Sequence, residues 1–189
     1  MINKEFHKTK VQIKSEQEDI EAAKNDIKNF EVLYNRYHEQ IFRYLYARVD
    51  SKSLASDLCS QVFYKAMLSI ENYNFKGVPF SSWLYRISFN EMNMHFRRNS
   101  KDRTINIDST NVSELEDEIE EEETEENKVQ LIKSLSELPE DKLCLIEMRY
   151  FEKMSFNQIA QIMGITENNA KVKIYRTLDL IKKDFKIKL

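Results

Sequence analysis

The sequence predicts an all-α protein made of two small helical domains joined by an acidic linker. Only two Gly and two Pro occur among 189 residues, so few positions interrupt a helix or favour a turn. Apolar residues recur at helical spacing in two separate stretches, and a run of acidic residues lies between them. We therefore expect an N-terminal extension at residues 1–29, a helical bundle at 30–103, a linker at 104–127 and a second domain at 128–189.

The first predicted domain is a bundle of three helices. Its apolar residues recur every three or four positions along three stretches, as on one face of a helix. Residues 50–53 form a turn before the second helix, and Pro79 suits the first turn of the third. The three apolar faces comprise Phe30, Leu33, Tyr34, Tyr37, Ile41, Tyr44 and Leu45, then Leu54, Leu58, Val62, Ala66 and Ile70, and then Phe80, Leu84, Ile87 and Met94. The mostly polar residues 1–29 are expected to be helical or disordered, and we assign them no function.

Residues 104–127 are predicted to be a linker because they cannot form a hydrophobic core. Ten of the thirteen residues 114–126 are acidic, so self-repulsion should keep them extended or weakly helical. Residues 104–126 hold eleven acidic residues and no Lys or Arg. Without these eleven negative charges the net charge changes from −3 to +8, so both flanking parts together are basic.

The second predicted domain contains a helix-turn-helix at residues 155–178. Ser155 and Gln158 have the spacing of a capping box at the start of a helix. Gly164 suits the left-handed residue that ends this helix, and Thr166 suits the N-cap of the next. Two small residues, Ala160 and Ala170, would let the helices cross closely. The apolar positions of the domain are Val129, Ile132, Leu135, Leu143, Ile146 and Tyr150, followed by Ile159, Met163, Ile174 and Leu178.

The outward face of the last helix is a candidate DNA-reading surface. Amide side chains can pair with adenine edges in the major groove, and cationic side chains can contact phosphates. The candidate residues are Thr166, Asn168, Asn169, Lys171, Val172, Lys173, Tyr175 and Arg176. The alternative is an ordinary pair of helices with a solvated polar face. DNA binding is favoured because the cap, the turn glycine and the small crossing residues coincide.

A second polar stripe lies along the third helix of the first domain. Arg86, Asn90, Asn93 and Arg97 are spaced so that they share one helix face. Such a stripe alone is more often a solvated face. Aromatic residues beside it, at positions 73, 75, 80 and 83, favour binding of single-stranded nucleic acid, where bases can stack on rings.

Several function classes find no support in the sequence. We identify no pair of nucleophile and base and no Gly-rich phosphate loop, so an enzyme is not expected. His7, His38 and His95 have no partner at metal-ligand spacing, so neither a metal nor another cofactor is expected. Cys59 and Cys144 fit small buried hydrophobes in a reducing compartment. The absence of a signal peptide and of a long apolar run predicts a cytoplasmic chain without membrane insertion.

Three segments of the chain resemble bacterial sigma factors. Residues 55–66 (ASDLCSQVFYKA) are similar to the segment with which these proteins bind core RNA polymerase. Residues 80–90 (FSSWLYRISFN), followed by Arg97 and Arg98, resemble the promoter-melting helix, and residues 155–178 resemble the C-terminal helix-turn-helix. The short distance between the two modules is typical of the extracytoplasmic-function group of the sigma-70 family.

This resemblance implies a partner and a role for each segment. Core RNA polymerase, through its β′ and β subunits, and promoter DNA, both duplex and melted, are the implied partners, and an anti-sigma factor is a further one. The residues implied to bind core polymerase are Asp57, Leu58, Gln61, Phe63 and Tyr64. Those implied to recognise and melt the −10 element, with one base flipped out of the strand, are Tyr73, Asn74, Phe75, Lys76, Trp83, Arg86, Asn90, Asn93, Arg97 and Arg98. The last helix would read the −35 element, and the acidic linker would run through polymerase.

Two other functions are compatible with parts of the sequence. A stand-alone transcriptional regulator would use the helix-turn-helix but leave Asp57, Gln61 and the region around Trp83 without a role. An interaction protein would act through the acidic linker. Binding to core polymerase distinguishes the sigma factor from both.

Overall fold

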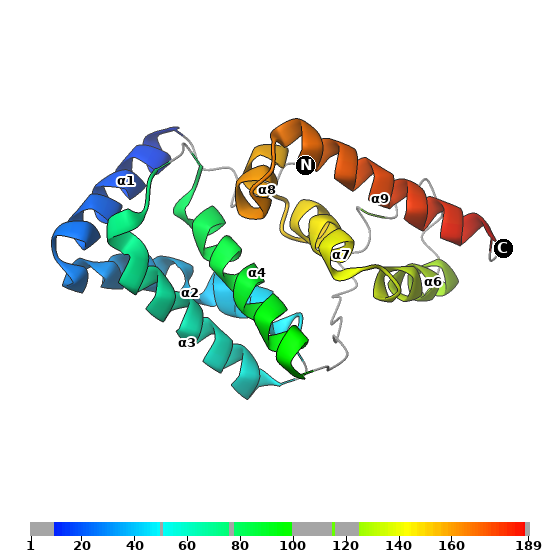
Figure 1. The fold of residues 1–189 in the computed structure, drawn as a ribbon, viewed down its shortest axis with the longest axis horizontal. Helices are drawn as coiled ribbons and strands as arrows, with labels where there is room; N and C mark the ends of the chain where they lie inside the picture. Colours follow the sequence, from blue (N-terminus) through cyan, green and yellow to red (C-terminus); the bar gives the residue numbers. More distant parts are fainter. Residues whose placement is uncertain (1–9, 50, 76–77, 100–114, 116–124, 188–189) are drawn as a thin grey trace. The chain divides into compact units, whose positions relative to one another are not determined.

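A computed structural model describes residues 10–49, 51–75, 78–99, 115 and 125–187 of the chain (Figure 1). The regular elements of these residues are all helical, as the sequence predicts. The described residues up to Asn99 belong to one compact unit, and those from Leu115 onward belong to a second. None of the described helices is both long enough and apolar enough to span a membrane.

Four α-helices and two short 3₁₀ turns make up the described part of the first unit. These are α1 (Lys10–Asn25), η1 (Ile27–Asn29), α2 (Phe30–Tyr46), α3 (Lys52–Ser69), η2 (Ile70–Asn72) and α4 (Phe80–Asn99). The side chain of Ser51 caps α3 by accepting a hydrogen bond from the backbone N–H of Leu54 at 3.3 Å. Helices α2, α3 and α4 pack on one another and bury most of the apolar residues predicted for them.

Four of the predicted core positions in this unit are only partly covered. They are Tyr34 of α2, which is 38% exposed, and the half-buried Leu54 of α3 and Ile87 and Met94 of α4. The buried face of α4 instead includes the polar residues Ser88 and Glu91. The hydroxyl of Ser88 donates to the carbonyl of Leu84, and Glu91 pairs with a lysine of α3, so both polar groups have partners. Apolar spacing alone therefore predicts the buried face correctly at Phe80 and Leu84 but not farther along α4.

Helix α1 is a packed part of the first unit, within the segment predicted as an extension without function. Ile20 and Ala23 are buried, and α1 packs against α2 and η2. An ion pair joins Asp19 of α1 to Arg36 of α2 at 2.6 Å. The side-chain amide of Asn29 donates to the carbonyl of Ala22 at 3.1 Å and closes the turn between the two helices. The apolar face of α1 is narrow, which explains why sequence periodicity does not indicate its docking.

The second unit contains α6 (Glu125–Ser136), α7 (Glu140–Ile146), the π-helical turn η3 (Glu147–Phe151), α8 (Phe156–Met163) and α9 (Glu167–Ile187). Residues 125–127, predicted as the end of the linker, form the first turn of α6. Leu115 is buried, and the rest of the predicted linker lies outside the described residues.

The core of the second unit is formed by α6, α7, α8 and α9. Its buried apolar residues include Leu131, Leu135, Leu143, Ile146, Met148, Tyr150, Ile159, Ala160, Ile162, Ala170, Ile174, Leu178 and Ile181. The prediction was wrong at Val129 and Ile132, which are 63% and 36% exposed, and Met163 is only half-buried. Ser134 takes part in the buried face instead, because its hydroxyl hydrogen-bonds to the carboxylate of Asp184 at 2.8 Å.

Candidate nucleic-acid interfaces

The ends of α8 are set by the local signals predicted from the sequence. The side chain of Ser155 accepts a hydrogen bond from the backbone N–H of Gln158 at 3.2 Å. The side chain of Gln158 accepts one from the backbone N–H of Ser155 at 2.8 Å, which completes the capping box. At the other end Gly164 adopts a left-handed conformation with φ 67°, as predicted. These contacts satisfy backbone groups that a helix leaves without partners at its ends.

Helix α9 begins next to this turn and presents the predicted reading face. The hydroxyl of Thr166 accepts a hydrogen bond from the backbone N–H of Asn169 at 3.2 Å, which confirms the predicted N-cap. Ala160 of α8 and Ala170 of α9 are both buried where the two helices pack. The eight candidate residues of this helix, at positions 166, 168, 169, 171, 172, 173, 175 and 176, are all exposed. Thr166 serves the cap, so it adds only a small polar surface at the start of the helix.

A cluster of cations and rings extends this face beyond α9, and no pattern in the sequence indicates it. The guanidinium of Arg149, in η3, lies 4.5 Å from the ring centre of Phe156 at the start of α8. The ammonium of Lys171 lies 5.5 Å from the same ring, and the ring of Tyr175 is 6.1 Å from it. Arg149 also donates to the carbonyl of Met154 at 3.0 Å, which holds its side chain in place. Arg149 and Phe156 are separated along the sequence, so only the fold brings them beside α9.

The polar stripe of α4 is available at the surface. Arg86, Asn90 and Arg97 are exposed, and Asn93 is half-buried. The side chain of Arg98 and the whole of Lys76 lie outside the described residues. One long helix thus presents two arginines and two amides along one side, a combination that suits phosphates and base edges.

Aromatic residues gather at the start of α4. The ring of Tyr73 lies 5.3 Å from Phe80 and 4.9 Å from Trp83, and Phe80 and Trp83 are 5.3 Å apart. Phe80 and Tyr73 are buried, whereas Trp83 and Phe75 are half-buried and Asn74 is exposed. Burial, and then the negative charge of Glu16, raise the pKa of Tyr73 to about 12. Tyr73 is therefore a support for the cluster, and the half-buried Trp83 offers its accessible surface.

The predicted polymerase-binding residues of α3 divide into an exposed and a buried set. Asp57, Gln61 and Tyr64 are exposed, in agreement with a docking face. Leu58 and Phe63 are only 4% exposed each, so they offer almost no surface to a partner in this fold. Phe63 instead underlies an aromatic group on α2, with Tyr34 at 4.9 Å and His38 at 6.0 Å between ring centres.

An ion pair links α3, which carries the predicted docking face, to α4, which carries the polar stripe. The ammonium of Lys65 on α3 lies 2.5 Å from the carboxylate of Glu91 on α4. Glu91 is buried and Lys65 is half-exposed, so the pair fixes the packing of the two helices at this point. No group of His, Cys, Asp and Glu side chains within the described part of the chain is arranged to hold a metal ion.

Two protein-family matches cover most of the chain. Residues 33–102 match Sigma-70 region 2, and residues 128–181 match Sigma-70, region 4. The first match contains most of α2 and the whole of α3 and α4, and the second contains the helix-turn-helix.

Individual proteins that are similar to this chain are also named as sigma factors. The ECF RNA polymerase sigma factor BldN of Streptomyces coelicolor is 30% identical over 77% of this chain, and the match spans 56% of BldN. The RNA polymerase sigma factor SigZ of Bacillus subtilis is 30% identical over 78% of this chain and 82% of SigZ. Among solved structures, CnrH in complex with the cytosolic domain of CnrY has a similar fold, with a TM-score of 0.60, 14% identity and coverage of 91% of this chain and 97% of CnrH.

Proposed function

The chain belongs to the extracytoplasmic-function group of the sigma-70 family, and on that basis we propose that it binds core RNA polymerase and directs promoter-specific transcription initiation. Members of this family are initiation factors and not enzymes. The observation that carries the proposal is the presence of region 2 and region 4 in one chain, each with an exposed polar or basic helix face. A stand-alone regulator would leave the surfaces of α3 and α4 without a role.

Helix α9 is proposed to read the −35 element as duplex DNA. Its N-terminal half carries amides and cations on an exposed face, which is the arrangement expected of a recognition helix in the major groove. We add Arg149 to the predicted residues because it is held against Phe156 beside Lys171. Its cation would contact phosphate at the edge of the groove.

Helix α4 and the aromatic cluster at its start are proposed to recognise and melt the −10 element. Arg86, Asn90 and Arg97 would follow the strand backbone and base edges, while Trp83 and Phe75 offer half-buried rings for stacking. Taking one base out of the duplex costs a few kcal/mol, which these contacts would have to offset. Lys76 and Arg98 keep their predicted roles on sequence grounds alone.

The exposed face of α3 is proposed to dock on the β′ subunit of polymerase. Asp57, Gln61 and Tyr64 form the contact surface, and Tyr64 is 58% exposed although it is a large aromatic residue. Leu58 and Phe63 would act indirectly by packing α3 onto the bundle. The second unit would contact the β subunit, and the chain would work in the cytoplasm, where polymerase acts.

We also propose that a protein partner regulates the chain. The resemblance to this family implies an anti-sigma factor, and the solved CnrH structure contains the cytosolic domain of a second protein, CnrY. Copurification from the source bacterium followed by a transcription assay would test this: a copurifying protein that inhibits transcription supports it.

In vitro transcription tests the main proposal. Core polymerase from the source bacterium is supplied with the chain and with a pooled promoter library, and transcripts are sequenced. We expect a shared sequence upstream of the start sites that core polymerase alone does not select. A chain that yields no selective transcripts, yet binds duplex DNA tightly without polymerase, would contradict the proposal.

Variants of α3 test the polymerase surface directly. Asp57→Ala and Gln61→Ala should weaken binding to core polymerase severalfold, because each removes an exposed polar group from the docking face. Glu39→Ala is the matched control, since Glu39 is an exposed carboxylate of α2. Fluorescence anisotropy with labelled chain measures all three. Equal affinities for the Asp57, Gln61 and Glu39 variants would exclude this face.

A further inference from the structure

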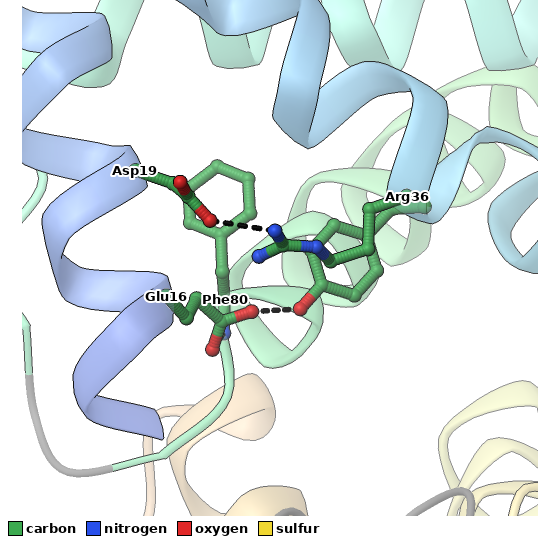
Figure 2. A network of polar contacts seen from close by, with 5 residues as sticks. Glu16, Asp19, Arg36 and Phe80 are labelled. Carbon is green, nitrogen blue, oxygen red and sulfur yellow. Dashed lines mark hydrogen bonds and ion pairs between the residues drawn. The ribbon is translucent and has the colours of Figure 1, made fainter. Parts of the chain in front are cut away.

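A carboxylate of α1 lies inside the first unit, next to the start of α4. Glu16 has no exposed surface. Its Oε2 accepts a hydrogen bond from the backbone N–H of Phe80 at 3.0 Å, and its Oε1 accepts one from the hydroxyl of Tyr37. Figure 2 shows Glu16 reaching from α1 toward Phe80. One side chain therefore connects α1, α2 and α4.

The bond to Phe80 satisfies a group that α4 cannot satisfy itself. Phe80 is the first residue of α4, and the first N–H groups of a helix have no partner within it. Phe80 is fully buried, so this N–H needs a partner from the protein. A carboxylate is a favourable partner because the helix dipole places positive partial charge at this end.

The same carboxylate lies close to the aromatic cluster. The ring of Phe80 contacts Tyr37 at 6.0 Å, and Tyr73 and Trp83 at 5.3 Å each between ring centres. The charge of Glu16 contributes to the raised pKa of Tyr73, which places the Tyr73 hydroxyl within its electrostatic reach. Glu16 thus contacts the backbone at the start of α4 and acts electrostatically on Tyr73, whose ring packs against Phe80.

Helix α1 is held firmly enough to fix the position of Glu16. The ion pair between Asp19 and Arg36 lies one turn along α1 (Figure 2). Ile20 and Ala23 are buried on the same helix. Displacing Glu16 would require these contacts to break.

We propose that Glu16 is a positioning residue for recognition of the melted −10 strand, acting through the N–H of Phe80 and the rings that Phe80 supports. The inference rests on the proposed function of α4 and its aromatic cluster. It assigns α1, which precedes the matched region 2, a part in promoter opening. Glu16 itself contacts no DNA, because it is fully buried.

Four variants separate hydrogen bonding from simple packing. Glu16→Gln can keep both contacts, because its oxygen accepts from Phe80 while its amide donates to the Tyr37 hydroxyl. Glu16→Leu removes both acceptors, and Glu16→Asp withdraws the carboxylate by one methylene. Glu18→Gln is the matched control, because Glu18 is an exposed carboxylate on the same helix.

Three affinities are measured for each variant, one of the free chain and two of the holoenzyme, which is the complex of the chain with core polymerase. The probes are core polymerase, a duplex with the −35 element, and a fluorescent single strand with the −10 element of a promoter recovered from the pooled library. Glu16→Leu should weaken binding of the single strand about tenfold, as expected when only about a tenth of the molecules keep the rings in the binding arrangement. Its other two affinities should stay within about twofold, since their surfaces lie on α3 and α9. Glu16→Gln and Glu18→Gln should bind the single strand nearly as the natural chain does.

Each contrary outcome has a definite meaning. Equal losses in all three affinities, or an unchanged single-strand affinity in Glu16→Leu, would overturn the positioning role. A loss in Glu16→Gln as large as in Glu16→Leu would also overturn it. If Glu16→Leu does not fold, Glu16→Asp takes its place, with an expected severalfold loss for the single strand alone.

Variants on α4 distinguish this inference from the function it rests on. Trp83→Ala and Asn90→Ala should weaken single-strand binding if α4 captures the −10 strand. If neither does so, the proposed function of α4 fails. If both do so and the Glu16 variants do not, only the role of Glu16 fails.

Discussion

At the scale of single residues, the exposed face of α9 carries cations together with amides. Lys171 lies near the ring of Phe156, and Arg176 follows about two turns after the amides at positions 168 and 169. A phosphate contact adds affinity without adding sequence preference, whereas an amide on a base edge adds sequence preference. The two kinds of residue should therefore separate in binding experiments.

We expect Arg176→Ala to weaken holoenzyme binding to −35 duplexes of any sequence. Loss of one phosphate contact should reduce the slope of log affinity against log salt by about 1. Lys133→Ala is the control, because Lys133 is an exposed cation on α6 outside the helix-turn-helix. Titrations at several salt concentrations measure the slope, and an unchanged slope would remove Arg176 from this role.

Tyr73 predicts a pH dependence of stability. Its pKa is about 12 in the folded chain, raised from an ordinary value of 10.0, so folding favours the protonated phenol. This contribution is fully present below pH 10 and is lost as the pH rises from about 10 to about 12. The free energy of unfolding should therefore fall more steeply over this range in the natural chain than in Tyr73→Phe. Urea denaturation at several pH values measures the difference, and identical slopes would contradict it.

At the scale of elements, the helix-turn-helix depends on the turn at Gly164. The backbone there is left-handed, and a Cβ atom added at this position would meet nothing within 4 Å, so space does not demand glycine. Backbone conformation alone favours glycine here, because a β-carbon disfavours the left-handed region by roughly 1–2 kcal/mol.

Gly164→Ala should accordingly destabilise α8 and α9 by about 1 kcal/mol. Gly164→Asn should cost less, since Asn tolerates the left-handed region better than other residues with a side chain. Hydrogen exchange at the buried amides of Ile159 and Ala170 reports the second unit without the first. An equal loss in both variants would mean that lost contacts, and not backbone conformation, control the turn.

At the scale of the whole molecule, the chain carries its basic surfaces in two separate units. The net charge is −3, but eleven acidic residues lie between positions 104 and 126, so the two units together are basic. Each helix proposed to bind DNA is a small surface on its own. Affinity for a promoter should come mainly from holding both on one DNA at the same time.

If polymerase holds both units on one promoter, the free chain and the holoenzyme should differ greatly in their affinity for DNA. The free chain should bind a −35 duplex weakly, and holoenzyme should bind a promoter with both elements on the order of 100-fold more tightly. Competition assays with promoters that lack one element measure each contribution. If the free chain binds the isolated −35 duplex as tightly as holoenzyme binds the promoter, tethering contributes nothing.

The sequence by itself determined the helical class, the two units and the ends of α8 and the start of α9. These features depend on local signals: the capping box at Ser155 and Gln158, the left-handed Gly164 and the cap at Thr166 act within a few residues. The motifs shared with sigma factors are also contiguous in the chain. Local geometry and contiguous motifs need no knowledge of distant contacts.

Only the tertiary structure decided which residues are covered and which distant residues meet. It buried Leu58 and Phe63, exposed Val129 and Ile132, and placed Arg149 against Phe156. It also joined Glu16 to Phe80 across 64 positions of sequence. A polar residue in a weakly apolar helix carries no local sign of burial, because its partners lie on other helices and become neighbours only when the bundle packs.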